Sequence, residues 1–141
     1  MLERFVSINV NGKNSYGIET EEGTINLSDH FPEWPTLLEV VQNKGFDKLL
    51  GSIKNRRVSY PKGTYKYNIP ISKPEKIICV GVNYPDRNEE YKDGQNTPSN
   101  MSLFVRFARS FVGHNSPIIR PKISKQLDYE GEVAIVLGAS G

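Results

Sequence analysis

The sequence predicts a strand-rich α+β fold in two parts, a small amino-terminal domain over residues 1–72 and the start of a larger sheet domain over residues 73–141. Apolar and polar residues alternate near the amino terminus, a helical apolar stripe follows, and the later apolar runs are short. The 141 residues include 12 Gly and 9 Pro, so the chain turns often and long helices are not expected.

The amino-terminal domain opens with an expected hairpin. Residues 5–10 alternate apolar and polar side chains, which is typical of a half-buried strand. Asn11 and Gly12 tolerate the positive φ angles of a tight turn, so residues 16–19 are expected to return beside the first strand. Residues 24–27 are expected to form a third strand.

Two short helices and a connector complete this domain. Thr36 and Glu39 form a capping-box pattern that predicts a helix, and Gly45 is expected to end it. A second helix is expected over residues 47–53. Residues 54–75 are basic and then interrupted by prolines, which predicts an extended connector rather than sheet.

The second part consists of strands and loops. Residues 76–82 are apolar on both faces, which predicts a buried strand, and residues 83–98 form a polar loop. Residues 103–107 are strand-like, and residues 118–120 are expected to form a short edge strand. Residues 129–137 are the last expected strand. Because the chain stops just after it, we expect the sheet to be incomplete.

The last expected strand begins with alternating carboxylates. Asp128, Glu130 and Glu132 occupy alternate positions, so on a strand all three would point to one face. A divalent cation would remove the cost of holding them together, and an all-oxygen ligand set favours Mg²⁺, Mn²⁺ or Ca²⁺ over zinc. Alternatively, the acids are solvated and pair with Lys122 or Lys125.

Further polar residues follow the strand at 76–82. Asp86 can accept hydrogen bonds, Arg87 can bind a carboxylate through two parallel hydrogen bonds, and Glu89 or Glu90 can act as a base. The same residue types suit an ordinary polar turn, so both interpretations stay open. Arg106, inside an apolar strand, predicts an anionic partner, either a structural ion pair or a substrate.

Composition excludes several classes. The net charge of +2 is too small to indicate a nucleic acid or an anionic membrane as partner, and no apolar run approaches the length of a spanning helix. The single cysteine, Cys79, cannot form an internal disulfide. Its apolar neighbours indicate a buried, reduced thiol and hence a cytoplasmic location.

Five segments together resemble the fumarylacetoacetate hydrolase family, in order and spacing: residues 76–84, 102–107, 110–114, 117–121 and 127–138. The resemblance is close over residues 76–141 and looser before them. It implies that the second part opens a mixed β-sheet roll. It also implies a Mg²⁺- or Mn²⁺-dependent enzyme that acts on 2-oxo or 1,3-dioxo acids by C–C hydrolysis, decarboxylation, hydration or keto–enol isomerisation.

The resemblance assigns roles to single residues. Glu130 and Glu132, with Asp86, match metal ligands. The substrate would be bound by three residues, Tyr84, Arg106 and Ser110. Arg87 and Glu90 stand where many members have a His–Glu pair that activates water. Since arginine cannot act as a general base near neutral pH, enolate chemistry is favoured over hydrolysis.

The family's remaining acidic ligand would lie beyond residue 141, so we expect this chain alone to be inactive. An alternative from another class is a non-catalytic binding module built on the same fold. The enzyme interpretation predicts a small-molecule oxo acid as partner, whereas in the binding module the acids bind salt or another partner. Neither interpretation predicts a nucleic acid or a membrane, and both predict self-association through an unpaired sheet edge. The resemblance implies that this association is a homodimer.

Overall fold

The computed structural model describes residues 3–81, 84, 94 and 100–138. They fall into two compact units, one made of residues 1–72 and 112–141 and the other of residues 73–111. The predicted strand-rich α+β class is confirmed. The predicted partition into domains at residue 72 stays a prediction.

The first unit contains a five-stranded antiparallel sheet. Its strands are β1 (Arg4–Val10), β2 (Lys13–Glu19), β3 (Gly23–Asn26), β4 (Tyr60–Pro61) and β5 (Lys66–Tyr67), in the order β4-β3-β2-β1-β5. The predicted hairpin turn is confirmed, because Asn11 and Gly12 have φ angles of 51° and 89° and Val10 lies opposite Lys13.

Both edges of this sheet come from the segment predicted as a connector. β4 pairs with β3 and β5 pairs with β1, each through two residues. The prediction missed these strands because two-residue pairings leave no alternating pattern in the sequence. Pro61, which has no backbone N–H, lies in an edge strand, where a missing donor is tolerated.

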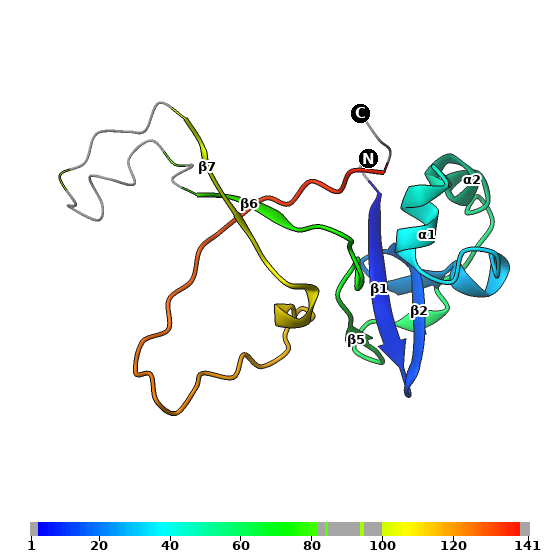
Figure 1. Ribbon diagram of the computed structural model, residues 1–141. Helices are drawn as coiled ribbons and strands as arrows, with labels where there is room; N and C mark the ends of the chain where they lie inside the picture. Colours follow the sequence, from blue (N-terminus) through cyan, green and yellow to red (C-terminus); the bar gives the residue numbers. More distant parts are fainter. Residues whose placement is uncertain (1–2, 82–83, 85–93, 95–99, 139–141) are drawn as a thin grey trace. The chain divides into compact units, whose positions relative to one another are not determined.

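Both predicted helices are present. α1 (Leu37–Gln42) begins with the predicted capping box: Thr36 Oγ1 accepts from the Leu38 N–H at 3.2 Å, and the Thr36 N–H donates to Glu39 Oε2 at 2.9 Å. α2 (Phe46–Gly51) follows after a short turn. The helices lie on the same side of the β1–β2 pair (Figure 1).

The end of α1 differs in detail from the prediction. Lys44, with φ of 51°, takes the left-handed position, and the N–H of Gly45 bonds to the Val40 carbonyl at 2.8 Å. Glycine is needed at position 45 because there is no room for a side chain: a Cβ atom there would lie 2.6 Å from the Trp34 ring.

A hydrophobic core fills the space between sheet and helices. Its buried members come from β2, from the loop around a short 3₁₀ helix (Ser28–His30) and from both helices: Tyr16, Ile18, Leu27, Phe31, Leu37, Val40 and Leu49. Burying side chains of this size contributes about 1.5–3 kcal/mol each, so this cluster is the main source of stability in the first unit.

The second unit is a two-stranded antiparallel ribbon. β6 (Ile78–Gly81) pairs with β7 (Ser102–Val105), with Ile78 opposite Val105, and a 3₁₀ turn (Ala108–Ser110) follows. Both predicted strands are confirmed, but burial on both faces is wrong: Ile78 is 61% exposed. Among the described residues no third strand joins this sheet, so neither of its faces is covered by further strands.

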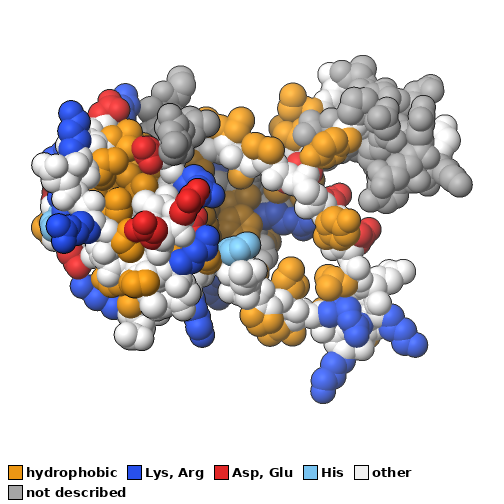
Figure 2. Space-filling view, turned by 180° about the vertical axis from the view of Figure 1, so that it is seen from behind, with side chains coloured by type: hydrophobic (Ala, Val, Ile, Leu, Met, Phe, Trp, Pro, Cys, Tyr) orange, Lys and Arg blue, Asp and Glu red, His pale blue; other side chains and the backbone are white. Residues whose placement is uncertain are grey.

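Residues 112–138 form no strand in the described part of the chain, so the strands predicted at 118–120 and 129–137 are wrong for this structure. A strand requires a neighbour that accepts its backbone hydrogen bonds, and no described strand pairs with either segment. The apolar side chains that such a neighbour would cover remain exposed: Ile118, Ile119, Val133, Ile135 and Leu137. Hydrophobic side chains are visible at many places on the surface in Figure 2.

No helix among the described residues is long and apolar enough to cross a membrane.

Candidate metal and substrate residues

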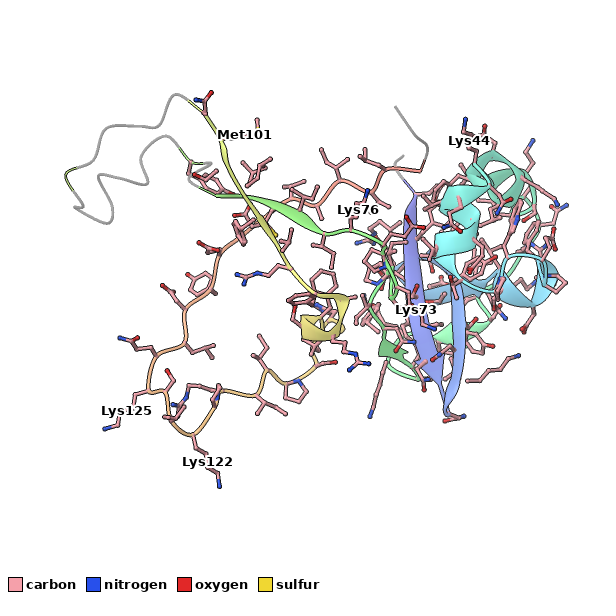
Figure 3. The ribbon with its side chains drawn as sticks, in the orientation of Figure 1. Lys44, Lys73, Lys76, Met101, Lys122 and Lys125 are labelled. Atoms are coloured by element: carbon pink, nitrogen blue, oxygen red, sulfur yellow. The ribbon has the colours of Figure 1, made fainter. Side chains whose placement is uncertain are left out.

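The predicted acid pair lies in the extended 112–138 segment of the first unit. Glu130 and Glu132 are exposed, and the Asp128 carboxylate accepts a hydrogen bond from the N–H of Tyr129 at 2.8 Å. Neither glutamate forms an ion pair with Lys122 or Lys125. Both lysines extend away from the backbone in Figure 3. Within the described residues, therefore, no salt bridge explains the acids as a structural feature.

The chemistry of the donor set fits a hard cation, but the described residues do not complete a site. Carboxylate oxygens are the ligands that Mg²⁺ and Mn²⁺ prefer. No three His, Cys, Asp or Glu side chains converge anywhere in the described ranges. Glu130 and Glu132 can supply two ligands, and further ligands must come from other residues. Asp86, the predicted third ligand, lies outside the described residues, as do Arg87 and Glu90.

The remaining predicted residues belong to the second unit. Arg106 follows β7 directly, is exposed, and holds its guanidinium 5.0 Å from the centre of the Phe104 ring. Its N–H donates to the carbonyl of Ile77, the residue before β6, at 3.2 Å. No carboxylate within the described part of the chain forms an ion pair with it, so its charge is available to an anion.

Ser110 and Tyr84 are held differently. The Ser110 hydroxyl donates to the Phe107 carbonyl at 2.8 Å within the 3₁₀ turn, a local bond that a ligand can replace. Tyr84 is 55% exposed. Arg106, Ser110 and Tyr84 are thus placed in one unit and the acid pair in the other, and their roles stay predictions.

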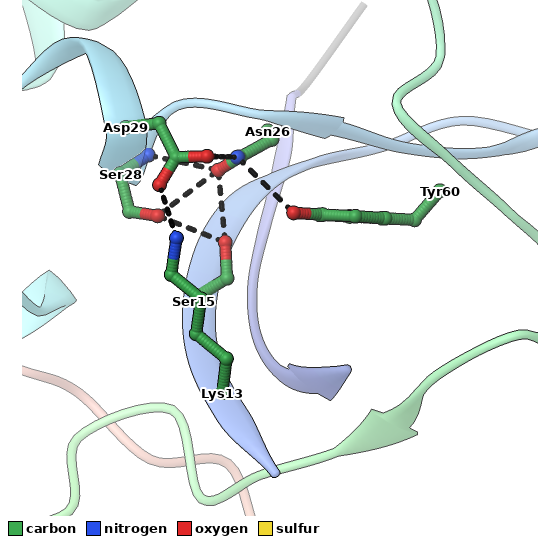
Figure 4. A network of polar contacts seen from close by, with 6 residues as sticks. All are labelled: Lys13, Ser15, Asn26, Ser28, Asp29 and Tyr60. Carbon is green, nitrogen blue, oxygen red and sulfur yellow. Dashed lines mark hydrogen bonds and ion pairs between the residues drawn. The ribbon is translucent and has the colours of Figure 1, made fainter. Parts of the chain in front are cut away.

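A buried polar network in the first unit was not anticipated. Asn26, 5% exposed, lies at its centre: its Oδ1 accepts from the hydroxyls of Ser15 at 2.8 Å and Ser28 at 3.0 Å. Its Nδ2 donates to Asp29 Oδ2 at 2.7 Å and to the Tyr60 hydroxyl at 3.4 Å (Figure 4). The network joins β2, β3, β4 and the 3₁₀ turn, and every polar group at its centre is paired.

An ion pair closes the network at the surface. Lys13 Nζ lies 3.0 Å from Asp29 Oδ1, and this bond, more than any other contact, holds the pKa of the Asp29 carboxyl below its ordinary value. The same bond raises the pKa of Lys13. The sequence does contain a signal for part of this network, because Asn26, Ser28 and Asp29 are residue types whose side chains bond to the backbone of a turn. The bond to Ser15 could not be predicted, because it depends on the register of the sheet.

A second polar contact lies at the opposite edge of the sheet. The Tyr67 hydroxyl on β5 donates to the Glu19 carboxylate on β2, and this bond, followed by partial burial, raises the pKa of Tyr67. Tyr67 therefore stays protonated throughout the physiological range. Neither the Asn26 network nor the Tyr67–Glu19 contact includes Glu130 or Glu132, so both are interpreted as structural.

Comparisons with known proteins agree with the sequence resemblance. Residues 76–141 match the model of the fumarylacetoacetate (FAA) hydrolase C-terminal domain. The mitochondrial oxaloacetate tautomerase Fahd2a of Rattus norvegicus is 32% identical over 124 residues, which cover 84% of this chain and 38% of that protein. The mitochondrial oxaloacetate tautomerase fahd2 of Xenopus laevis is 35% identical over 133 residues, covering 89% and 40%.

The fold also matches a solved structure. A crystal structure of an HpcE-type protein from Mycobacterium smegmatis superposes with a TM-score of 0.62 at 20% identity, covering 84% of this chain and 41% of that one. The chain spans about two fifths of the length of these proteins. On the family match and on these relatives, residues 76–141 belong to the fumarylacetoacetate hydrolase family.

Proposed function

We propose that this chain is part of a Mg²⁺- or Mn²⁺-dependent enzyme that interconverts the keto and enol forms of a 2-oxo diacid, of which oxaloacetate is the leading candidate. The observation that carries the proposal is the alternating acid pair within a family-matched segment whose similar proteins are named oxaloacetate tautomerases. C–C hydrolysis, decarboxylation and hydration are the alternative reactions, since they pass through the same kind of metal-stabilised enolate.

Glu130 and Glu132 would hold the metal, with Asp86 as a further ligand. The bound ion would supply a Lewis acid that stabilises negative charge on the 2-oxo group of the substrate. Because the two glutamates are exposed and unpaired with any described lysine or arginine, binding the ion breaks no existing salt bridge.

The cationic residues would bind the substrate's carboxylates. Arg106 has an exposed guanidinium and no described ion-pair partner, and Arg87 offers a second bidentate donor. Tyr84 and Ser110 would donate or accept hydrogen bonds at the oxo group. Keto–enol interconversion moves one proton between C3 and the oxo oxygen, and Glu90 is the group we assign to accept and return that proton.

Isomerisation is favoured over hydrolysis for a chemical reason. Hydrolysis through a His–Glu pair requires a base that removes a proton from water, and Arg87, at the position of that histidine, stays protonated. Tautomerisation needs no activated water. Arg87 therefore fits a role in binding an anionic substrate.

The test uses the full product of the reading frame that contains residues 1–141. Conversion of enol-oxaloacetate to the keto form is followed by ultraviolet absorbance with Mg²⁺, with Mn²⁺ and with a chelator. We expect metal-dependent acceleration that Glu130→Gln and Glu132→Gln each abolish and that Glu21→Gln, an exposed acid on another segment, leaves intact. Equal activity in all three variants would contradict the assignment of the acid pair.

Compartment and assembly are separate proposals. The cytoplasmic location stays a prediction, and the tautomerases named above are mitochondrial. Self-association is proposed from the exposed apolar side chains of residues 112–138 and of the β6–β7 ribbon. Light scattering after gel filtration would show a dimer or larger species, and a monomer at high concentration would contradict this proposal.

A further inference from the structure

The turn at residues 113–116 lies directly against β5. A Cβ atom at Gly113 would lie 2.4 Å from the Tyr67 carbonyl oxygen and 3.3 Å from the carbonyl carbon of Asn68. Gly113 has no positive φ angle, so the close approach of the two backbones, and not backbone conformation, requires glycine here.

The turn itself is ordered by local bonds. The Ser116 N–H donates to the Gly113 carbonyl at 3.0 Å, and Asn115 adopts a left-handed φ of 59°, which asparagine tolerates better than most residues. The His114 ring packs edge-on against the Tyr67 ring, with centroids 5.3 Å apart and planes at 78°. Backbone and side chain of the turn thus meet the same residue.

Besides its contacts with the turn, Tyr67 has three contacts with the amino-terminal domain. Its backbone pairs with Ile8 on β1, its hydroxyl donates to Glu19 on β2, and its ring packs against Tyr65 at 5.4 Å and 86°. The N–H of the next residue, Asn68, donates to the Ser7 carbonyl at 2.8 Å. A side chain held in this way presents a rigid surface.

We propose that Tyr67 anchors the 113–116 turn to the amino-terminal sheet. Through this contact the sheet positions the family-matched segment that leads to the acid pair. The amino-terminal sheet then serves as a platform for that segment. The proposal rests on contacts within the first unit and is independent of the catalytic proposal.

Hydrogen–deuterium exchange by mass spectrometry on the 141-residue chain tests this proposal, with peptides that cover residues 112–118. The Ser116 amide, bonded within the turn, is the reporter. Gly113→Ala places a methyl group against the Tyr67 carbonyl, and we expect exchange of these peptides to rise at least about tenfold while amides of β1, β2 and β3 keep their wild-type rates. Gly51→Ala is the matched control, since a Cβ atom there meets no neighbour within 4 Å.

His114→Ala keeps the proposal testable if Gly113→Ala unfolds the whole unit, because it only removes atoms. We expect a smaller rise, about threefold or more, confined to the same peptides. His30→Ala, which changes an exposed histidine in the 3₁₀ helix Ser28–His30, should change nothing there. Wild-type peptides that already exchange at the unprotected rate, or His114→Ala peptides that exchange as in wild type, would overturn the anchoring role of Tyr67.

Discussion

Replacing Asn26 with aspartate probes the buried polar network with an almost isosteric change. The Nδ2 group that donates to Asp29 Oδ2 at 2.7 Å becomes a carboxylate oxygen, so a hydrogen bond turns into contact between two negative charges. The bond to the Tyr60 hydroxyl can be kept, because that hydroxyl can donate instead. The change therefore isolates the contact with Asp29.

Two contributions set the magnitude. A hydrogen bond to a charged group contributes about 1.5–3 kcal/mol, and two like charges about 4 Å apart repel by about 4 kcal/mol at the effective dielectric constant near a protein surface. Protonation of the new carboxyl limits the repulsion. We therefore expect Asn26→Asp to lower the free energy of unfolding by about 4 kcal/mol at neutral pH, and Asn26→Ala by about 2 kcal/mol.

The sign of the pH dependence follows from the same contact. The neighbouring Asp29 charge raises the pKa of the new carboxyl in the folded state, so the folded state is penalised most at neutral pH. The penalty shrinks as pH falls and the carboxyl takes up its proton. The difference between Asn26→Asp and wild type should therefore narrow in acid.

Urea unfolding followed by the fluorescence of Trp34, the single tryptophan, measures these differences. Asn9→Asp is the matched control, since Asn9 also donates to an oxygen, that of Asn14 at 2.8 Å, but at an exposed position and to a neutral group. A loss below about 1 kcal/mol for Asn26→Asp, or a loss equal to that of Asn9→Asp, would refute the assigned role of the network.

Three further outcomes are expected. Thr36→Ala removes the capping side chain of α1 and should cost about 0.5–2 kcal/mol in urea unfolding, whereas Thr36→Ser should cost less. Gly45→Ala forces a methyl group against Trp34 and should both destabilise the chain and shift tryptophan emission, and unchanged emission would contradict the contact. Burial raises the pKa of Tyr16 to about 12, so its contribution to stability is complete below pH 10 and lost as pH rises through 12; Tyr16→Phe should remove that loss in alkaline urea titrations.

The amino-terminal sheet and helices could be predicted because their signals are local. The turn at Asn11 and Gly12 and the capping box of Thr36 and Glu39 specify backbone geometry within four residues, and both are present. The edge strands could not be predicted, because β4 and β5 pair through only two residues each with strands far away in the sequence.

The later strands failed for the opposite reason. Residues 129–137 have a clear apolar pattern, which indicates the side chains that a strand would bury. Among the described residues no neighbouring strand pairs with this segment, so those side chains stay exposed. The same limit applies to the candidate site. Acid spacing at Glu130 and Glu132 indicates metal chemistry, whereas the identity of the further ligands depends on tertiary packing that no local pattern encodes.

Binding of Mn²⁺ tests the central claim, that Glu130 and Glu132 are metal ligands of an oxo-acid enzyme, most directly. Electron paramagnetic resonance titration of the full product of the reading frame that contains these residues counts bound ions and needs no substrate. We predict saturable binding that weakens at least about tenfold in Glu130→Gln and in Glu132→Gln. Mutating residues that only support metal ligands already lowers metal affinity by about tenfold or more, so losing a ligand should cost at least as much. Binding of equal strength in wild type and in both variants would contradict the account.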